Sequence, residues 1–187
     1  MLLIDRVLSV LALPTPAMPL LIGGCGAGRT HALHAVVARL AADTTPVYLD
    51  VERIATTPEQ CYRSLLRTVR VADEGDVLPA PASLTSPRAA FDAILALLTT
   101  ARAASGRRFT FLLDEVLDLR TFESFPGLRS LMAETGTAVS TSPNRFVLAT
   151  RFAQRGARLA KSWPGITSLS LDDAGNEADG RAASAFG

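Results

Sequence analysis

A glycine-rich segment, GGCGAGRT, occupies Gly23–Thr30 of this chain. The short apolar run Pro19–Gly23 leads into it, and Thr30–Ala42, an alanine-rich stretch with apolar residues at helical spacing, follows it. Glycines let the backbone curl, so that successive N–H groups point inward and bind an anion beside the positive end of the next helix. The pattern predicts a buried strand, an anion-binding loop and a helix in succession.

The segment fits the phosphate-loop pattern G-x-x-x-x-G-[KR]-[ST] and departs from its strict form at one position, where Arg29 stands in place of lysine. In such a loop the backbone binds phosphate oxygens, the cation contacts the outer phosphates, and the Thr30 hydroxyl reaches Mg²⁺. The alternative interpretation is a glycine-rich turn that binds no ligand. The candidate nucleotide-binding residues are Gly23, Gly24, Cys25, Gly26, Ala27, Gly28, Arg29, Thr30 and His31.

Two adjacent carboxylates end another apolar strand, Phe109–Glu115, which reads FTFLLDE. The first, Asp114, can hold Mg²⁺ together with the Thr30 hydroxyl. The second, Glu115, can act as a general base that polarises a water for attack on the terminal phosphate. The alternative is an acidic strand end that faces solvent, and the phosphate loop upstream argues against it. Asp118, close to this pair in the sequence, is expected at the surface.

A third polar strand end is Ala149–Arg151, which closes the apolar run Arg145–Thr150. At the carboxyl edge of a parallel sheet this strand end would lie between the phosphate loop and the two carboxylates. Thr150 could orient the attacking water, and Arg151 could contact the terminal phosphate. The alternative is an ordinary solvated strand end.

Apolar and polar stretches alternate along the chain as strands and helices would. Strands are expected at Pro19–Gly23, Pro46–Val51, Arg108–Asp114, Arg145–Thr150 and Gly165–Leu171. Helices are expected over about residues 2–12, 30–42, 58–71, 88–104 and 154–162, with a loop over 73–87 and a helical or irregular stretch around 122–134. This alternation predicts a parallel sheet covered by helices on both faces.

Length and charge limit the classes of protein to consider. The 187 residues suit one domain, and the 48% hydrophobic content is enough for a real core. The 19 basic and 18 acidic side chains nearly cancel, so net charge gives no support for a nucleic-acid or membrane partner. The apolar N-terminal stretch is interrupted by Asp5, Arg6 and three prolines, so no membrane-spanning helix is predicted.

Cysteine and lysine usage adds two points. Two cysteines, Cys25 and Cys61, exclude a disulfide framework and a cysteine-based zinc site, and a reduced, cytoplasmic setting is expected. The only lysine is Lys161, so the arginine at position 29 is consistent with a general bias against lysine. Arginine keeps the charge, but its planar fork is bulkier than an ammonium group.

Taken together, GGCGAGRT, FLLDE and FVLATR resemble the Walker A, Walker B and sensor-1 motifs of P-loop ATPases of the AAA+ and STAND type. The layout is also similar to that of the origin-recognition-type AAA+ ATPases. The resemblance covers about residues 1–172. It implies a three-layer αβα P-loop NTPase fold, with a five-stranded parallel sheet of order 5-1-4-3-2 and nucleotide at the carboxyl ends of the strands. It also implies ATP or ADP and Mg²⁺ as ligands, with a protein partner or self-association.

Two features depart from the family pattern. One is Arg29, and the other is the small, polar segment 173–187, which is too short for the helical lid that follows the core in the family. The lid is then truncated, absent or supplied by another polypeptide. Arg155 and Arg158 lie where the family carries an arginine finger, although a solvated basic helix face is the simpler interpretation.

The resulting hypothesis is a Mg-dependent ATP-binding domain that hydrolyses ATP to drive or gate a macromolecular partner. The alternative is a non-hydrolysing nucleotide switch or scaffold subunit. A third interpretation, a small-molecule phosphotransferase, has less support because no arginine-rich lid segment or acceptor pocket is evident in the sequence.

Overall fold

A computed structural model describes residues 2–13, 17–40, 44–72 and 84–171. Five strands form one parallel sheet in the order β2-β3-β4-β1-β5. The strands are β1 (Met18–Ile22), β2 (Thr44–Asp50), β3 (Arg108–Asp114), β4 (Arg145–Thr150) and β5 (Ile166–Ser170). This is the predicted order 5-1-4-3-2 read from the opposite edge, so the predicted P-loop NTPase-like α/β fold is confirmed.

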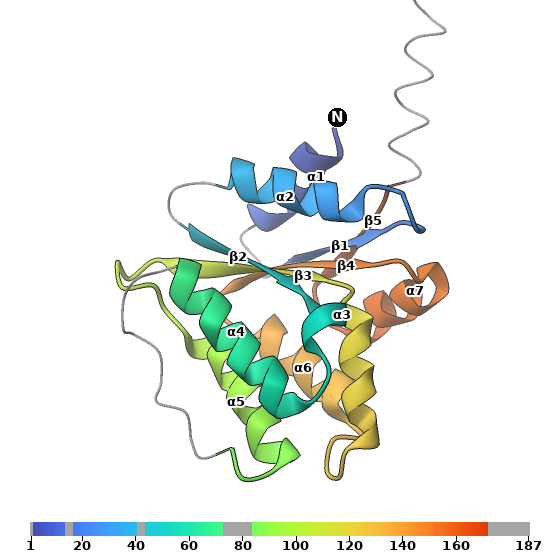
Figure 1. The fold of residues 1–187 in the computed structure, drawn as a ribbon. Helices are drawn as coiled ribbons and strands as arrows, with labels where there is room; N and C mark the ends of the chain where they lie inside the picture. Colours follow the sequence, from blue (N-terminus) through green and yellow to red (C-terminus); the bar gives the residue numbers. More distant parts are fainter. Residues whose placement is uncertain (1, 14–16, 41–43, 73–83, 172–187) are drawn as a thin grey trace, which may run out of the picture.

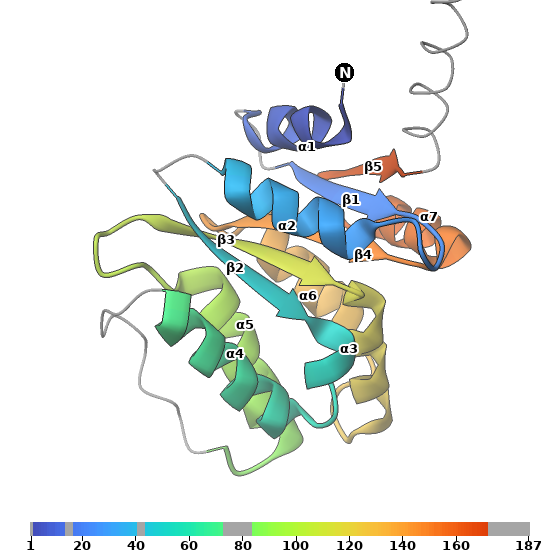
Figure 2. The same ribbon diagram turned by 45° about the horizontal axis from the view of Figure 1, so that its top comes forward.

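Helices cover both faces of the sheet (Figures 1 and 2). One face carries α1 (Leu3–Leu11) and α2 (Arg29–Arg39). The opposite side carries the remaining helical elements, which are α3 (Val51–Ile54), α4 (Pro58–Ala72), α5 (Pro87–Thr100), η1 (Val116–Ser124), α6 (Leu131–Ser140) and α7 (Ala153–Ser162). None of the described helices combines the length and the apolar content that crossing a membrane requires.

The alternation of side chains along the central strands builds two apolar layers. On β1, Leu20 packs with the cluster under α4, α5 and η1, whereas its neighbour Leu21 packs with the cluster under α1 and α2. Both side chains are fully buried. Because successive side chains in a strand point to opposite faces, a strand covered on both sides must be apolar throughout. This requirement explains the short apolar runs that the sequence shows.

Most predicted elements lie within a few residues of the observed ones. The short helix α3 was not predicted, and its first residue, Val51, was expected to end the preceding strand. Two further segments differ. The stretch around 122–134 holds two elements, because η1 starts directly after the Asp-Glu pair and α6 continues to Ser140. Strand β2 starts at Thr44, before the expected Pro46. A proline without an N–H is tolerated there because β2 lies at the edge of the sheet. The segment 173–187 and most of the predicted loop at 73–87 lie outside the described residues.

Candidate functional site

The glycine-rich loop joins β1 to α2 at the carboxyl edge of the sheet (Figure 2). Gly26 and Gly28 have φ angles of 79° and 80°, in the left-handed region that glycine adopts without a Cβ penalty. A Cβ on Gly24, Gly26 or Gly28 would meet nothing within 4 Å, so the space beside this part of the loop is open. A Cβ on Gly23 would lie 3.1 Å from Leu171 Cβ, so the start of the loop is closely packed.

The Arg29 side chain folds back over this loop. Its guanidinium donates hydrogen bonds to the carbonyl oxygens of Gly23 and Gly24, the latter at 2.9 Å. It also donates to Glu115 Oε1 and forms an ion pair with that carboxylate. The side chain is only 12% exposed, and its Nε atom is buried without a hydrogen-bond partner. Arg29 therefore links the glycine-rich loop to the end of β3.

Asp114 lies at the end of β3 and is 4% exposed. Its Oδ2 atom accepts hydrogen bonds from the Thr30 hydroxyl at 2.7 Å and from the Tyr48 hydroxyl at 3.1 Å. Its Oδ1 atom is buried and has no partner. A buried carboxylate oxygen without a partner is costly unless a cation or water satisfies it. A carboxylate and an adjacent hydroxyl are suitable oxygen ligands for Mg²⁺, so these residues fit the predicted ion.

Such an ion would need further ligands. Among the described residues, no group of three or more His, Cys, Asp or Glu side chains is arranged to hold a metal. Mg²⁺ usually keeps several waters and binds one or two protein groups together with substrate phosphates. The pair formed by Thr30 and Asp114 matches that mode of binding.

Glu115 has an unusual backbone conformation at the junction of β3 and η1. Its φ angle is 54°, in the left-handed region that non-glycine residues seldom adopt. Such strain costs about 1–2 kcal/mol and is often found at functional sites. The side chain is buried, and burial raises its pKa. The Arg151 backbone N–H, which donates to Oε2 at 3.2 Å, and the charges of Arg29 and Arg151 oppose that rise.

The Arg151 side chain is a second cationic partner of Glu115, besides Arg29. Its Nη1 atom lies 3.4 Å from Glu115 Oε1, and its two terminal nitrogens bond both carboxylate oxygens of Glu52 at 2.9 and 3.3 Å. Asp118 Oδ2 lies 3.9 Å from Nη2. The expectation that Asp118 is a surface residue is wrong, because its side chain is 22% exposed and turns toward Arg151. Burial raises the pKa of Asp118.

The remaining predicted site residues lie near this cluster. Thr150 is fully buried, and its hydroxyl accepts a hydrogen bond from the Phe152 N–H at 3.2 Å. Its carbonyl accepts one from the Gly23 N–H at 3.4 Å, which ties β4 to the loop. Cys25 is exposed with a free thiol, and His31 is exposed in the first turn of α2. Neither side chain forms a hydrogen bond or ion pair with Asp114 or Glu115 in the part of the chain that the structure describes.

Sequence reasoning missed two members of the site, Tyr48 on β2 and Glu52 on α3. Tyr48 belongs to β2, the strand that neighbours β3, and Glu52 to the helix that follows β2 directly. At the end of β2, Asp50 pairs in register with Asp114. The strand order implied by the resemblance was the available signal, because it places the end of β2 beside Asp114. Burial and the charge of Asp114 raise the pKa of Tyr48 to about 12, so its hydroxyl remains a donor to Asp114 at neutral pH.

Comparison with solved structures supports the same architecture. The Walker-type ATPase of Pyrococcus abyssi superposes with a TM-score of 0.60 and 18% identity, over 89% of this chain and 52% of that one. Cdc6p of Pyrobaculum aerophilum gives 0.55 and 14%, over 90% and 43%. The Aeropyrum pernix ORC2 protein gives 0.52 and 16%, over 89% and 44%. No family model matches the sequence, and no curated protein is significantly similar to it.

This chain has a P-loop NTPase-like α/β fold and is structurally similar to a Walker-type ATPase and to ORC/Cdc6 AAA+ proteins. It spans about half the length of those proteins or somewhat less.

Proposed function

We propose that this protein is a Mg-dependent ATP-binding domain that hydrolyses ATP to drive or gate a macromolecular partner. One observation carries the proposal: four side chains with the chemistry of nucleotide hydrolysis converge at one edge of the sheet. Thr30 contacts Asp114 and Arg29 contacts Glu115, although 84 and 86 residues separate the members of each pair. A glycine-rich turn without a ligand would not need this convergence.

In the proposed site, the N–H groups of Gly23–Thr30 bind the phosphates at the positive end of α2. Arg29 contacts the outer phosphates once it leaves Glu115. Thr30 and Asp114 hold Mg²⁺, and Tyr48 orients the Asp114 carboxylate from the other side. When bound, the ion would neutralise charge that develops on the phosphate oxygens.

Glu115 is the proposed general base. It accepts a proton from the attacking water, and the Arg151 N–H fixes the orientation of its carboxylate. The burial that raises the pKa of Glu115 makes it a stronger base than an exposed carboxylate. Arg151, and Thr150 beside it, would contact the terminal phosphate.

The alternative function, a non-hydrolysing nucleotide switch or scaffold subunit, is favoured by one specific observation. Both Arg29 and Arg151 contact Glu115, so the proposed base is ion-paired on two sides. If nucleotide leaves these ion pairs intact, Glu115 cannot activate water. The Aeropyrum pernix ORC2 protein was solved as ADPNP–ADP complexes, which supports nucleotide binding by this fold under either function.

Titration with a fluorescent ATP analogue and Mg²⁺, followed by single-turnover hydrolysis of ATP, separates the two functions. Saturable binding, with turnover that Glu115→Gln abolishes, is the expected result. Nucleotide binding without detectable hydrolysis, in the wild type and in Glu115→Gln alike, would favour the switch. Absence of binding at millimolar nucleotide would overturn both.

The organisation of the chain and its setting belong to the same proposal. Residues 1–172 would form the nucleotide-binding core, and 173–187 would be the start of a lid or a polar tail. The partner would be a protein or a second copy of this chain, in the cytoplasm, and the overall charge balance does not favour nucleic acid.

A further inference from the structure

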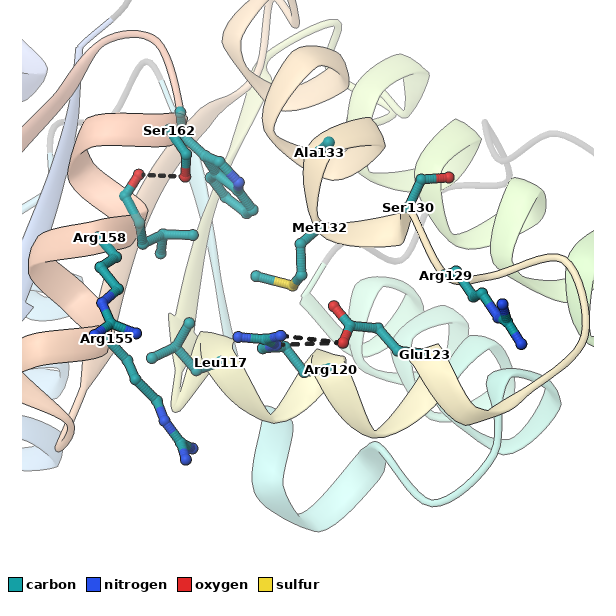
Figure 3. A pocket seen from close by; sticks show the side chains of 12 residues that line it. Leu117, Arg120, Glu123, Arg129, Ser130, Met132, Ala133, Arg155, Arg158 and Ser162 are labelled. Carbon is teal, nitrogen blue, oxygen red and sulfur yellow. Dashed lines mark hydrogen bonds and ion pairs between the residues drawn. The ribbon is translucent and has the colours of Figure 1, made fainter.

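A groove separate from the phosphate loop lies between η1, α6 and α7 (Figure 3). Its volume is about 440 Å³, and no residue of Gly23–Thr30 lines it. We propose that this groove, called here the arginine groove, binds an acidic peptide segment of a partner protein, which inserts one apolar side chain between the helices.

The floor of the arginine groove is apolar. Leu117 and Leu159 are buried side chains that reach it from η1 and α7, and the half-buried Met132 completes it from α6. Figure 3 shows Leu117 and Met132 pointing into the space between these elements. Covering apolar surface contributes about 25 cal/mol per Å², so an apolar side chain of a partner would gain free energy here.

Trp163 forms a preformed wall of the groove. Its indole ring lies against α6 where Gly136 has no side chain, and a Cβ there would come within 2.5 Å of the ring. The ring is 3% exposed and cannot move aside easily. A rigid wall reduces the ordering cost that a ligand meets on binding.

Positive charge surrounds this apolar floor. The groove is lined by four arginines and a single carboxylate, which belongs to Glu123. Arg120 is paired with Glu123 at 3.2 Å. Arg129, Arg155 and Arg158 form no ion pair with any carboxylate of the described residues, and all three are exposed. The chain as a whole has a net charge of only +1, so the groove is a local concentration of positive charge.

The exposed arginines and the apolar floor of the groove together favour an acidic peptide with one apolar side chain as the ligand. Carboxylates of an acidic peptide would pair with the exposed guanidinium groups of the groove. One of these groups, on Arg155, also lies 5.0 Å from the centroid of the Phe152 ring. A nucleic-acid backbone would also meet these arginines, but it would leave the apolar floor uncovered. Aromatic and aliphatic anchors in a pocket with a polar rim are typical of protein–protein recognition.

The single tryptophan of the chain provides a direct measurement. Short synthetic peptides of Glu and Ser with one central Leu or Phe are titrated into the full chain without nucleotide, while Trp163 fluorescence is recorded. We expect a saturable change in emission. The same peptides with Ala at the central position should bind roughly tenfold more weakly, because the apolar anchor is lost.

Two charge-reversal variants test the location. Arg155→Glu/Arg158→Glu, at exposed positions of α7, should weaken peptide binding roughly tenfold or more. Arg63→Glu/Arg67→Glu makes the same change in net charge at exposed positions of α4 and should leave binding nearly unchanged. Circular dichroism of both variants verifies that each is folded.

Several outcomes would overturn the proposal. Equal weakening by both double variants would mean that attraction is non-specific. Equal binding of the Ala peptide would show that the apolar floor is unused, and tighter binding of a single-stranded oligonucleotide at the same arginines would assign the groove to nucleic acid. A flat Trp163 response to all the acidic peptides would also refute it. None of these results depends on nucleotide, so the proposed ATPase function would be unaffected.

Discussion

Arg29 and Glu115 form an ion pair that joins the glycine-rich loop to the end of β3. Their side chains are 12% and 5% exposed, so water screens the pair only weakly. The outer phosphates of a nucleotide would need the same guanidinium that now contacts Glu115 and the loop carbonyls. In the proposed function, Glu115 and the nucleotide would therefore compete for Arg29.

This competition predicts that Glu115→Gln binds ATP more tightly than the wild type, by roughly tenfold, although hydrolysis is lost. The amide keeps the size of the side chain but removes the charge that holds Arg29. Equilibrium titration with a fluorescent ATP analogue measures the change. In an Arg29→Ala background the same substitution should have no effect on affinity, and an equal gain in that background would refute the competition.

Arg29→Lys should speed single-turnover hydrolysis severalfold. An ammonium group is a compact point charge and lacks the planar fork with which Arg29 bonds two loop carbonyls and Glu115 together. The lysine would therefore release Glu115 more readily to act on water. Rapid-quench measurement of phosphate release gives the rate. Lys161→Arg, which replaces lysine by arginine at a position outside the site, is the control. A slower Arg29→Lys enzyme would show that arginine is the better residue in this site.

Tyr48→Phe should raise the Mg²⁺ concentration needed for half-maximal nucleotide binding by roughly fivefold. The hydroxyl that it removes donates to Asp114 Oδ2 and helps to orient the carboxylate. Because the pKa of Tyr48 is about 12, the hydroxyl is protonated at neutral pH, and the effect should be constant between about pH 6 and 9. Tyr62→Phe is the control, since Tyr62 lies on α4 and is buried more deeply than the half-buried Tyr48. Similar shifts in both variants would contradict a specific role for Tyr48.

The two cysteines should differ sharply in reactivity. Cys25 is exposed in the glycine-rich loop, whereas burial raises the pKa of the Cys61 thiol to about 12 and keeps it protonated and inaccessible. Iodoacetamide should label Cys25 in the native protein and Cys61 only after denaturation, as peptide mass mapping can show. Saturating ATP with Mg²⁺ should protect Cys25. Labelling that proceeds at the same rate with and without nucleotide would argue against binding at this loop.

Gly136→Ala should destabilise the protein by about 1–3 kcal/mol, although alanine favours helices over glycine by about 1 kcal/mol. The added Cβ would come within 2.5 Å of the buried Trp163 ring, so either the ring or α6 must shift. Urea unfolding followed by Trp163 fluorescence measures the change. Thr137→Ala, at an exposed position on the same helix, serves as the control. A gain in stability for Gly136→Ala would mean that the contact relaxes at no cost.

The strands, the glycine-rich loop and the positions of the motifs could all be predicted from local patterns in the sequence. Apolar runs of strand length and glycines with positive φ, as at Gly26 and Gly28, are local requirements of the backbone, and a local pattern records them. The order of the strands needed the family resemblance, because alternating strands and helices are compatible with several sheet orders.

The contacts between side chains from distant segments could not be predicted in this way. The pairing of Arg29 with Glu115 joins residues 86 positions apart, and the contact of Tyr48 with Asp114 depends on β2 lying beside β3. The left-handed backbone conformation at Glu115 could not be predicted either, because the residue there is not a glycine. Hydrogen bonds and ion pairs between distant segments depend on how the sheet and helices pack, and packing brings together residues that no local pattern connects.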